Sequence, residues 1–370
     1  MKSTVLLTLA LGLLTFSSCK KDTTEEDTTS DTTPSYTVPE TYSFGSNANY
    51  TLATAHINMA KELVGYVRSA HNVTNNIVLD VNKMKGMFMN TAGSFTDVTL
   101  ANVALSLNSK MSDAYGLKTA FDGLLSEIAT VSSNTTAAQD GTAGKLVGSN
   151  SAGTQSAWLV DKNGFEYKEL VEKGIMGAVF YAEAMKLLKD IESFDNTAIV
   201  AGEGTAMEHA WDLAFGYFGV PSSFPTSTTG LSYWGNYCNS VNTAIGSNAL
   251  MMNAFLKGRA AITGKDLSTM REARNTLVAN WEKFAAAKLV NYLKGAKTNF
   301  ALDGQRIHNL SEAIGFIRGF RYNSSKIITD AQIDQQLQLL GTNLYTITSS
   351  NIDQLITNLC SIYNLDASKL

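Results

Sequence analysis

The sequence predicts an all-α protein whose folded part consists of two pseudo-repeated helical-bundle halves. Only four prolines occur in 370 residues, and the long proline-free segments are rich in Ala, Leu, Met, Lys and Glu, which favours helix. No run of alternating polar and apolar residues has the length of a convincing strand. A stretch of the first half also resembles a stretch of the second half in the type of residue at each position, which suggests a repeat.

Apolar residues recur at helical spacing from Tyr42 onward, as Ala55, Met59 and Leu63 do in the first segment. The expected helices cover residues 52–70, 80–89, 115–131, 166–191, 205–218, 249–262, 268–294, 306–322, 330–340 and 352–364. Gly219 and Pro221 are typical of a helix end.

The domain organisation follows from the breaks between these helices. We expect one all-helical domain over residues 44–370, with approximate halves 44–221 and 247–370. The segment 222–246 between them is rich in Ser, Thr, Gly and Tyr and predicts a connecting loop. Long connections in compact domains are often functional, so this loop is a candidate binding surface for a protein or a glycan.

Residues 1–18 have the plan of a secretory signal peptide. Lys2 precedes the apolar run Val5–Phe16, and two serines lead to Cys19. This ending resembles the lipobox of bacterial lipoproteins, with Phe16 where leucine is usual. The resemblance implies cleavage before Cys19 and lipidation of that cysteine, and acyl chains bind a membrane through about 0.8 kcal/mol per buried methylene.

Residues 19–43 predict a disordered tether, because no apolar residue lies between Cys19 and Tyr36. Two lysines and an acidic cluster resemble the surface-export signal of Bacteroidota lipoproteins. Repeated Asp-Thr-Thr triplets resemble the O-glycosylation sequon of that phylum, with Thr23, Thr28 and Thr32 as the acceptors. The alternative is a solvated spacer. The expected location is the outer membrane, lipid-anchored and exposed at the cell surface.

The amino-acid composition limits the kinds of molecule that the protein is expected to bind. The formal net charge is −4 with 17% charged residues, so there is no basic surplus for nucleic acid. Apart from Cys19 the only cysteines are Cys238 and Cys360, which we expect to be separate thiols, although a single disulfide suits the compartment.

The repeat is seen in HAWDLAFGYF, which begins at His209, and HNLSEAIGFI, which begins at His308. The two lie 308 − 209 = 99 positions apart, and bulky apolar residues match bulky apolar residues. A helix turns by 100° per residue, so His209, Asp212 and Gly216 lie on the side of the helix opposite its bulky apolar residues.

The second helix has the same arrangement: the side opposite its bulky apolar residues has His308, Glu312, Gly315 and Gly319. Glycine inside a helix costs about 1 kcal/mol relative to alanine and is expected where another backbone comes close. We therefore expect the two glycine faces to pack on each other about a pseudo-twofold. That packing would bring both histidines and both acids together.

Several runs resemble an uncharacterised Bacteroidota lipoprotein family, a domain of unknown function that itself looks imelysin-like. These runs are INMAKELVGYV (57–67), EYKELVEKGIMGAVFY (166–181), EHAWDLAFGYFGVP (208–221), MNAFLKGRAAI (252–262) and HNLSEAIGFIRGFRYN (308–323). Imelysin-like proteins are all-helical with two bundle halves, carry a Gly-x-His-x-x-Glu motif, and include iron-uptake components and a proposed metallopeptidase. In this sequence His209 matches the histidine of the motif, Asp212 stands in place of its glutamate, and Met207 stands in place of its glycine.

These residues define a candidate metal site of His209, Asp212, His308, Glu312 and Glu208, with iron favoured. Carboxylates and imidazoles suit transition ions, and a histidine and an acid three residues later lie on one helix face. Two alternatives remain: a structural pair in which Asp212 orients His209, and a site for an organic ligand.

Four cations, Lys257, Arg259, Arg318 and Arg321, are expected to pair with acids or to lie at helix ends. The alternative for them is an anionic ligand.

No His-Glu-x-x-His, Gly-x-Ser-x-Gly, phosphate-loop or dinucleotide motif occurs in a fitting context, and we identify no catalytic residue. The leading hypothesis is an envelope lipoprotein that captures or relays iron or another metal. The second hypothesis is a metal-free accessory module that binds a protein or glycan partner through residues 222–246. The third is a metallopeptidase-like enzyme.

Overall fold

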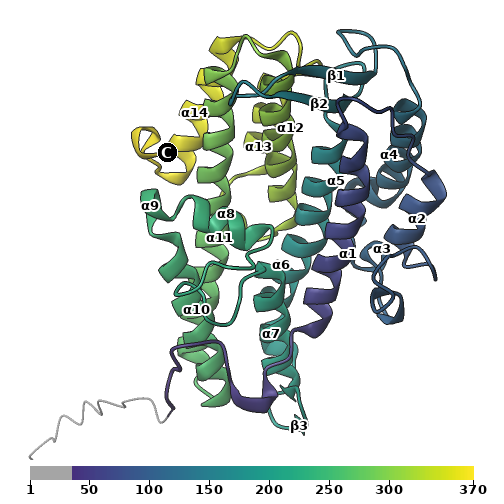
Figure 1. Cartoon of the computed structure of the whole chain (residues 1–370). Helices are drawn as coiled ribbons and strands as arrows, with labels where there is room; N and C mark the ends of the chain where they lie inside the picture. The colour runs from purple at the N-terminus through teal and green to yellow at the C-terminus, as the bar shows by residue number, and fades with distance from the viewer. Residues whose placement is uncertain (1–35) are drawn as a thin grey trace, which may run out of the picture. The chain divides into compact units, whose positions relative to one another are not determined.

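Helices make up most of the regular structure in residues 36–370, the residues that this computed structural model describes (Figure 1). The α-helices are α1 (Thr51–Arg68), α2 (Val81–Met89), α3 (Leu107–Lys110), α4 (Leu117–Ser132), α5 (Tyr167–Ile175), α6 (Ala182–Lys189), α7 (Ala206–Phe218), α8 (Trp234–Ser240), α9 (Asn242–Ile245), α10 (Ser247–Thr263), α11 (Leu267–Thr298), α12 (Asp303–Gly319), α13 (Asp330–Leu340) and α14 (Ser349–Tyr363). The predicted all-α class is confirmed. The predicted signal peptide, Cys19, Thr23, Thr28 and Thr32 lie outside the described residues.

Short 3-10 helices extend or connect these elements. They are Gly45–Asn47, Ser69–His71, Leu100–Asn102, Ala114–Gly116, Ile191–Ser193, Phe320–Tyr322 and Ala367–Lys369. Most predicted helix ends lie within a few residues of the observed ones, because capping residues define them. Thr205 and Glu208 form a capping box at the start of α7, and Gly219 ends that helix with a φ of 79°.

Two small antiparallel strand pairs interrupt the helices, and the sequence did not predict them. One is the hairpin of β1 (Gly144–Ser149) and β2 (Gln155–Val160), paired from Gly144↔Val160 to Ser149↔Gln155, and the other joins β3 (Ile199–Val200) to β4 (Gly204–Thr205). The hairpin lies across one end of the helices in Figure 1. Its Trp158 packs on Gly304 at the start of α12, where a Cβ would lie 2.2 Å from the indole ring.

The predicted long helix 166–191 contains a π-helical segment. α5 continues through the π-helix Met176–Tyr181 into α6, and two carbonyls of the wide turn have partners elsewhere in the chain. The indole N–H of Trp234 donates to Met176 O (3.0 Å), and the N–H of Ser112 donates to Ala178 O (2.8 Å). A π-turn breaks the regular i→i−4 ladder, so these external donors stabilise it.

The connection 222–246 is not a simple loop. It contains α8 and α9, and its aromatic residues Phe224, Trp234 and Tyr237 are buried. These three aromatic side chains therefore belong to the core rather than to a loop surface.

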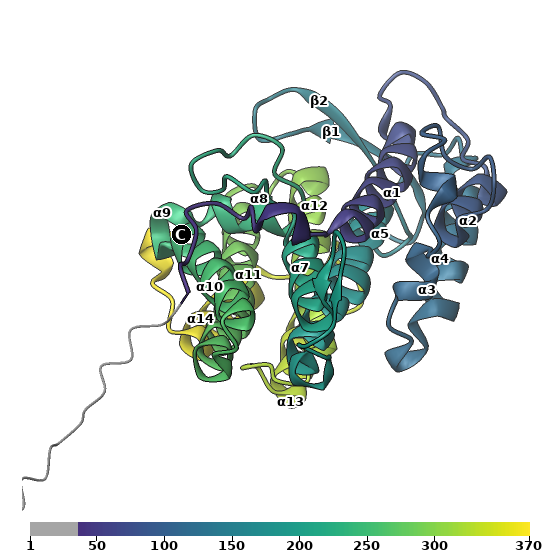
Figure 2. The same ribbon diagram turned by 90° about the horizontal axis from the view of Figure 1, so that it is seen from below.

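The core is continuous across the two predicted halves. α11 packs on α8, α10, α12 and α14, while α12 also packs on α5 of the first half. Figures 1 and 2 agree in placing α2, α3 and α4 beside α1 and α5, on the side away from α10 and α11. Residues 36–370 form one compact unit, so the proposed halves share one core.

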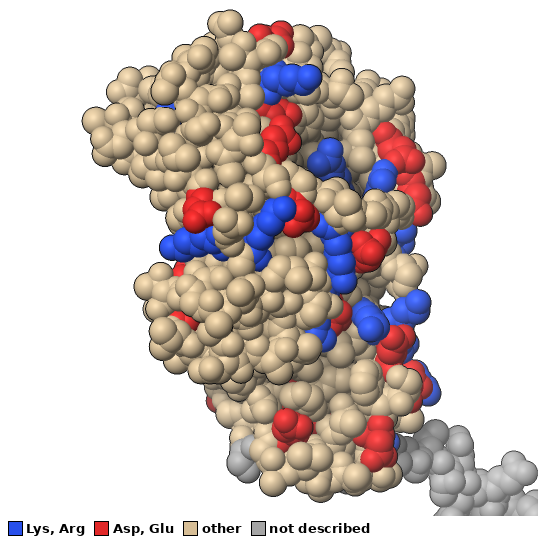
Figure 3. All heavy atoms as spheres, turned by 90° about the vertical axis from the view of Figure 1, so that its right-hand side faces the viewer, with Lys and Arg blue, Asp and Glu red and all other residues tan. Residues whose placement is uncertain are grey.

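Two further observations concern the cysteines and the surface. Cys238 is buried, Cys360 is half-buried, and both are free thiols. From Tyr36 onward, no helix has both the length and the apolar character that a membrane span requires. Figure 3 shows a face on which acidic and basic side chains are interspersed, without an area of a single sign.

We predict that Gly258→Ala destabilises the protein by about 1–3 kcal/mol, because an added Cβ would lie 2.1 Å from the ring of Trp211. That ring is fully buried and its N–H donates to Phe255 O (3.0 Å), so it has no room to move. The matched control is Gly65→Ala in α1, where a Cβ meets nothing within 4 Å. Urea denaturation of both variants is the measurement; equal stabilities would contradict the prediction.

Candidate functional site: a buried charged cluster between α5 and α12

α5 has a stripe of charged side chains that is buried. Its four members, Lys168, Glu169, Glu172 and Lys173, each expose at most 8% of their surface. Spacings of one, four and five residues place these four on neighbouring positions of one helix face. Isolated buried charges are very costly, so such a stripe is stable only when opposite charges meet within it.

The two lysines are held by the two glutamates. Lys168 Nζ lies 2.6 Å from both Glu169 Oε1 and Glu172 Oε2. Lys173 Nζ lies 2.7 Å from Glu172 Oε1 and 3.1 Å from Glu169 Oε2, and it donates to the hydroxyl of Tyr237 at 2.7 Å. The cluster formed by α5 is therefore an alternating network of cations and anions.

α12 completes the cluster with His308 and Glu312. Glu312 Oε2 lies 2.7 Å from Lys173 Nζ, and His308 Nε2 lies 4.0 Å from Glu312 Oε1. Gly315 allows this approach, because a Cβ there would lie 2.1 Å from Cβ of Lys173. The lysine side chain therefore passes directly over the backbone of α12.

Two residues outside both helices extend the cluster. His308 Nδ1–H donates to Glu166 Oε2 at 2.7 Å, since a carboxylate can only accept. Nδ1 of His71 lies 3.7 Å from Glu166 Oε1, and His71 Nε2 is buried without a hydrogen-bond partner among the described residues. The backbone N–H of Glu166 donates to Ser311 Oγ at 2.9 Å, which fixes Glu166 to α12.

The environment separates the pKa values of the two histidines. Burial lowers the pKa of His308, but the carboxylates of Glu166, Glu169 and Glu312 outweigh it and raise that pKa to about 9. Burial lowers the pKa of His71 and outweighs the same kind of carboxylate effect. His71 is therefore a neutral imidazole near pH 7, and His308 is protonated.

The acids and lysines of the cluster are shifted as well. Burial raises the pKa of Glu312 to about 7 against the opposing effect of Lys173. Burial disfavours the ammonium of Lys173, yet Glu169, Glu172 and Glu312 hold its pKa well above the ordinary value. The two lysines in turn outweigh burial and lower the pKa of Glu169.

Part of the cluster has the geometry of a metal-ligand set. Single ligand atoms of Glu166, Glu169 and His308 all lie within 4.8 Å of one another. These residues and His71 line a pocket of about 450 Å³ whose rim includes Trp158 of β2. The arrangement can therefore receive a cation from solvent at a place where carboxylate and imidazole atoms converge.

The sequence-predicted acids of α7 lie in a different cluster. Glu208 Oε1 accepts from Arg259 Nη1 (2.7 Å) and Thr263 Oγ1 (2.6 Å), while Asp212 Oδ1 accepts from Arg259 Nε (2.9 Å). Burial raises the pKa of Asp212 to about 6, although Arg259 and Tyr42 act in the opposite direction.

This second cluster holds the segment before α1. The hydroxyl of Tyr42 donates to Asp212 Oδ1 (2.7 Å), and the N–H of Asn49 donates to Asp212 Oδ2 (3.1 Å). The lone pairs of Asp212 that a metal would use are therefore occupied by donors from Arg259 and from this segment, which Figure 1 shows in purple along the ends of α7 and α10. Asp212 is better suited to fixing the start of the folded domain than to binding a cation.

His209 does not take part in either cluster. It forms no hydrogen bond or ion pair with the described residues, and its Nδ1 is buried without a partner. The predicted pairing of Asp212 with His209 is therefore not observed. Within the described residues, the set His209, Asp212, His308, Glu312 and Glu208 is not among the groups whose ligand atoms converge.

The glycine faces also have partners that differ from the prediction. Gly216 packs on Ala53 and Tyr50 beside α1, whereas Gly315 packs on Lys173 of α5. Gly319 lies against Gly177, where a Cβ added to Gly177 would be 2.9 Å from Cα of Gly319. Each face meets a helix of the first half, so the two faces do not pack on each other.

The residues that sequence reasoning missed are those of EYKELVEK, 166–173. Lysine and glutamate at these spacings usually mark a solvated helix face with i, i+4 pairs. The indication of burial was the proline-free apolar run GIMGAVFY that follows directly. His71 carries no motif, because it is brought to the site only by the turn after α1.

These features define an all-α protein with a charged cluster buried between two helices, whose carboxylates and imidazoles line a pocket. The chain belongs to the family described as domain of unknown function DUF4856, whose model matches residues 39–365. The match includes every residue of the charged cluster. Neither the curated proteins nor the solved structures contain a match to the chain.

We predict that the metal-free protein loses stability as pH rises from 6.5 to 9. The folded state keeps the proton of His308 up to about pH 9, while the unfolded chain loses it near 6.5. The resulting stabilisation is complete below pH 6.5 and disappears above pH 9, and it amounts to about 3 kcal/mol at 1.36 kcal/mol per pKa unit.

Urea denaturation in the presence of a chelator at several pH values between 6 and 9.5 measures this effect. The control is His308→Gln, in which the free energy of unfolding should change much less over the same range. An unchanged slope in that variant would show that another group is responsible.

Proposed function

We propose that the protein captures a divalent transition-metal ion at Glu166, Glu169 and His308, with His71 as a fourth ligand. The observation that carries this proposal is the convergence of the first three ligand atoms within 4.8 Å at the base of a pocket. Transition ions bind nitrogen and oxygen ligands at about 2.0–2.2 Å, so small side-chain movements would complete the site.

The protonation of the two imidazoles supports this choice of ligands. A histidine binds metal in its neutral form, and His71 is already neutral because burial lowers its pKa. His71 Nε2 is buried without a hydrogen-bond partner among the described residues, so it has a lone pair to offer.

The lysines are the competitors of the metal ion. Lys168 and Lys173 neutralise Glu169 in the structure described, and a bound ion would share or replace their role. Such competition lowers the affinity for monovalent ions most, because a single positive charge gains little where an ammonium is already present. It suits a protein that loads and releases its ion.

Iron is the ion we propose first. Two imidazoles with two carboxylates form a mixed set that suits ferrous iron or zinc better than calcium, which prefers oxygen ligands alone. The site differs from the one predicted by sequence, since His308 belongs to both but Asp212 and Glu208 do not take part.

We further propose that the protein is a lipid-anchored lipoprotein of the outer membrane, exposed at the cell surface. This proposal is supported by the apolar run before Cys19 and by the polar stretch that follows. The resemblance to imelysin-like proteins of Bacteroidota belongs to the same proposal. It is supported by the all-α fold and by the runs 166–181, 208–221 and 308–323.

We predict that Glu166→Gln and His308→Gln lower the affinity for ferrous iron by at least about 100-fold. That is the upper end of the 10–100-fold loss usual for residues that only support ligands. The measurement is anaerobic calorimetric titration of chelator-stripped protein beginning at Tyr36, with zinc and manganese in parallel. The affinity should rise with pH up to about 9, because binding displaces the proton of His308.

Glu172→Gln is the matched control, since it removes the same charge six residues further along the chain, within α5, but lies outside the converging set. It should change the affinity by less than about tenfold. Asp212→Asn tests the site predicted from sequence. Loss of binding in Asp212→Asn with normal binding in Glu166→Gln would overturn the proposal, as would the lack of any stoichiometric ion in the unmodified protein.

We predict that Cys19→Ser transfers the protein from the membrane fraction to the soluble fraction, because the acyl chains would be lost. Immunoblots of fractionated cells measure this, and protease treatment of intact cells tests surface exposure. Protein that resists the protease until the outer membrane is broken would contradict the surface location.

A further inference from the structure

A second, mainly apolar pocket lies between α4, α5 and α12. It has a volume of about 210 Å³ and includes Leu117, Phe121 and Leu124 of α4 and Leu170 of α5. Gly174 and Gly319 also line it, so parts of α5 and α12 contribute only backbone to the wall. The result is a hollow whose α4 side is wholly apolar.

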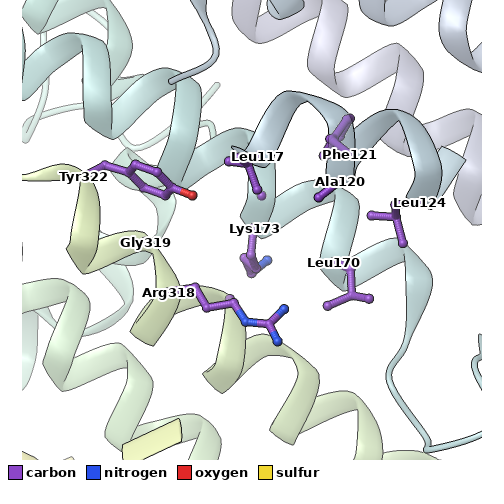
Figure 4. Close-up of a pocket in the computed structure, with 11 residues that line it drawn as sticks. Leu117, Ala120, Phe121, Leu124, Leu170, Lys173, Arg318, Gly319 and Tyr322 are labelled. Carbon is purple, nitrogen blue, oxygen red and sulfur yellow. The ribbon is translucent and has the colours of Figure 1, made fainter. Parts of the chain in front are cut away.

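The opposite side of this pocket has two polar groups that the protein itself does not use. Arg318 and Tyr322 line it, and neither forms a side-chain hydrogen bond or an ion pair with the described residues. In Figure 4 the guanidinium of Arg318 extends below Lys173 toward Leu170, and the hydroxyl of Tyr322 points toward Leu117. Two hydrogen-bond donors therefore face an apolar wall.

Arg318 is an exception among the four cations that the sequence singled out. Arg259 pairs with Asp212, Lys257 with Glu272 and Arg321 with Asp334. Arg318 is exposed at the surface and pairs with no acid among residues 36–370, and partial loss of solvent around it lowers its pKa. Lys173, the other cation of the pocket wall, is already neutralised by three carboxylates.

We infer that this pocket binds an aliphatic monocarboxylate, with the carboxylate on Arg318 and Tyr322 and the chain against α4. A single guanidinium matches one carboxylate through two parallel hydrogen bonds, and a tyrosine hydroxyl adds a third donor. The apolar wall excludes a wholly polar anion as the preferred ligand. None of the proposed metal ligands lines this pocket.

The volume of the pocket limits the length of the ligand's aliphatic chain. A cavity of about 150 Å³ is known to hold benzene, which has six carbons. By proportion, about 210 Å³ holds roughly eight carbons, so octanoate is the probe of matching size.

The test is a calorimetric titration of the purified protein with octanoate, octanol and octyl phosphate. Octanoate should bind saturably and more tightly than the other two, because only it combines the chain with a single carboxylate. Arg318→Gln should lower the affinity for octanoate roughly 10–100-fold, which is the loss expected when a hydrogen bond to a charged group is removed. The affinity for octanol should be unchanged.

Two further variants locate the site. Ala120 lies exposed on α4 at the pocket, so Ala120→Trp can fill the pocket without disturbing the core and should abolish binding. Arg321→Gln is the matched control, since Arg321 does not line the pocket, and it should bind octanoate normally. The inference is overturned if octanoate shows no saturable binding, if Arg318→Gln binds it equally well, or if octyl phosphate binds more tightly.

Discussion

The ammonium of Lys173 is the point on which the packing of α5 against α12 depends. It is buried, and it lies within 3.1 Å of carboxylate oxygens from Glu169, Glu172 and Glu312. Removing one partner of such a network leaves a buried charge without compensation, which typically costs 3–5 kcal/mol. The same network explains Gly315, because a larger residue there would displace the lysine from its three acids.

The cluster also explains why two helices with polar faces can lie in the interior. A charged stripe is buried only when each charge meets an opposite charge. The pairing of α5 with α12 is therefore more specific than the pairing of two apolar helices would be. The neighbouring π-helix contributes to the same contact. It brings Gly177 against Gly319, so the helices approach closely just beyond the charged stripe.

Sequence patterns predicted the helices well because the determinants of a helix are local. The apolar spacing in 205–218, the Thr205–Glu208 cap and the glycine at 219 all act within a few residues. The β1–β2 hairpin was missed because it is stabilised by a distant contact, that of Trp158 with Gly304. The connection 222–246 was taken for a loop for a similar reason, since α8 is held by the bond from Trp234 to the π-turn.

The candidate site was predicted less well, because a helical pattern gives the face of a residue but not its partner. Asp212 was expected in the interior and does lie there, but its partner is Arg259 of α10 rather than a histidine. His308 and Glu312 were assigned to the correct face of their helix, yet the residues they meet come from α5 and from the turn after α1. Such pairings depend on how helices far apart in sequence cross.

The polar stretch 166–173 connects three hollows of the molecule. Glu166, Lys168 and Glu169 line the pocket of the proposed metal site, Glu172 lines a second hollow beside Tyr233 and Tyr237, and Lys173 lines the apolar pocket near Arg318. Ion pairs of Lys173 with Glu169 and Glu172 join these three walls within one network. The buried network thus holds α5 against α12 and contributes side chains to the walls of all three hollows.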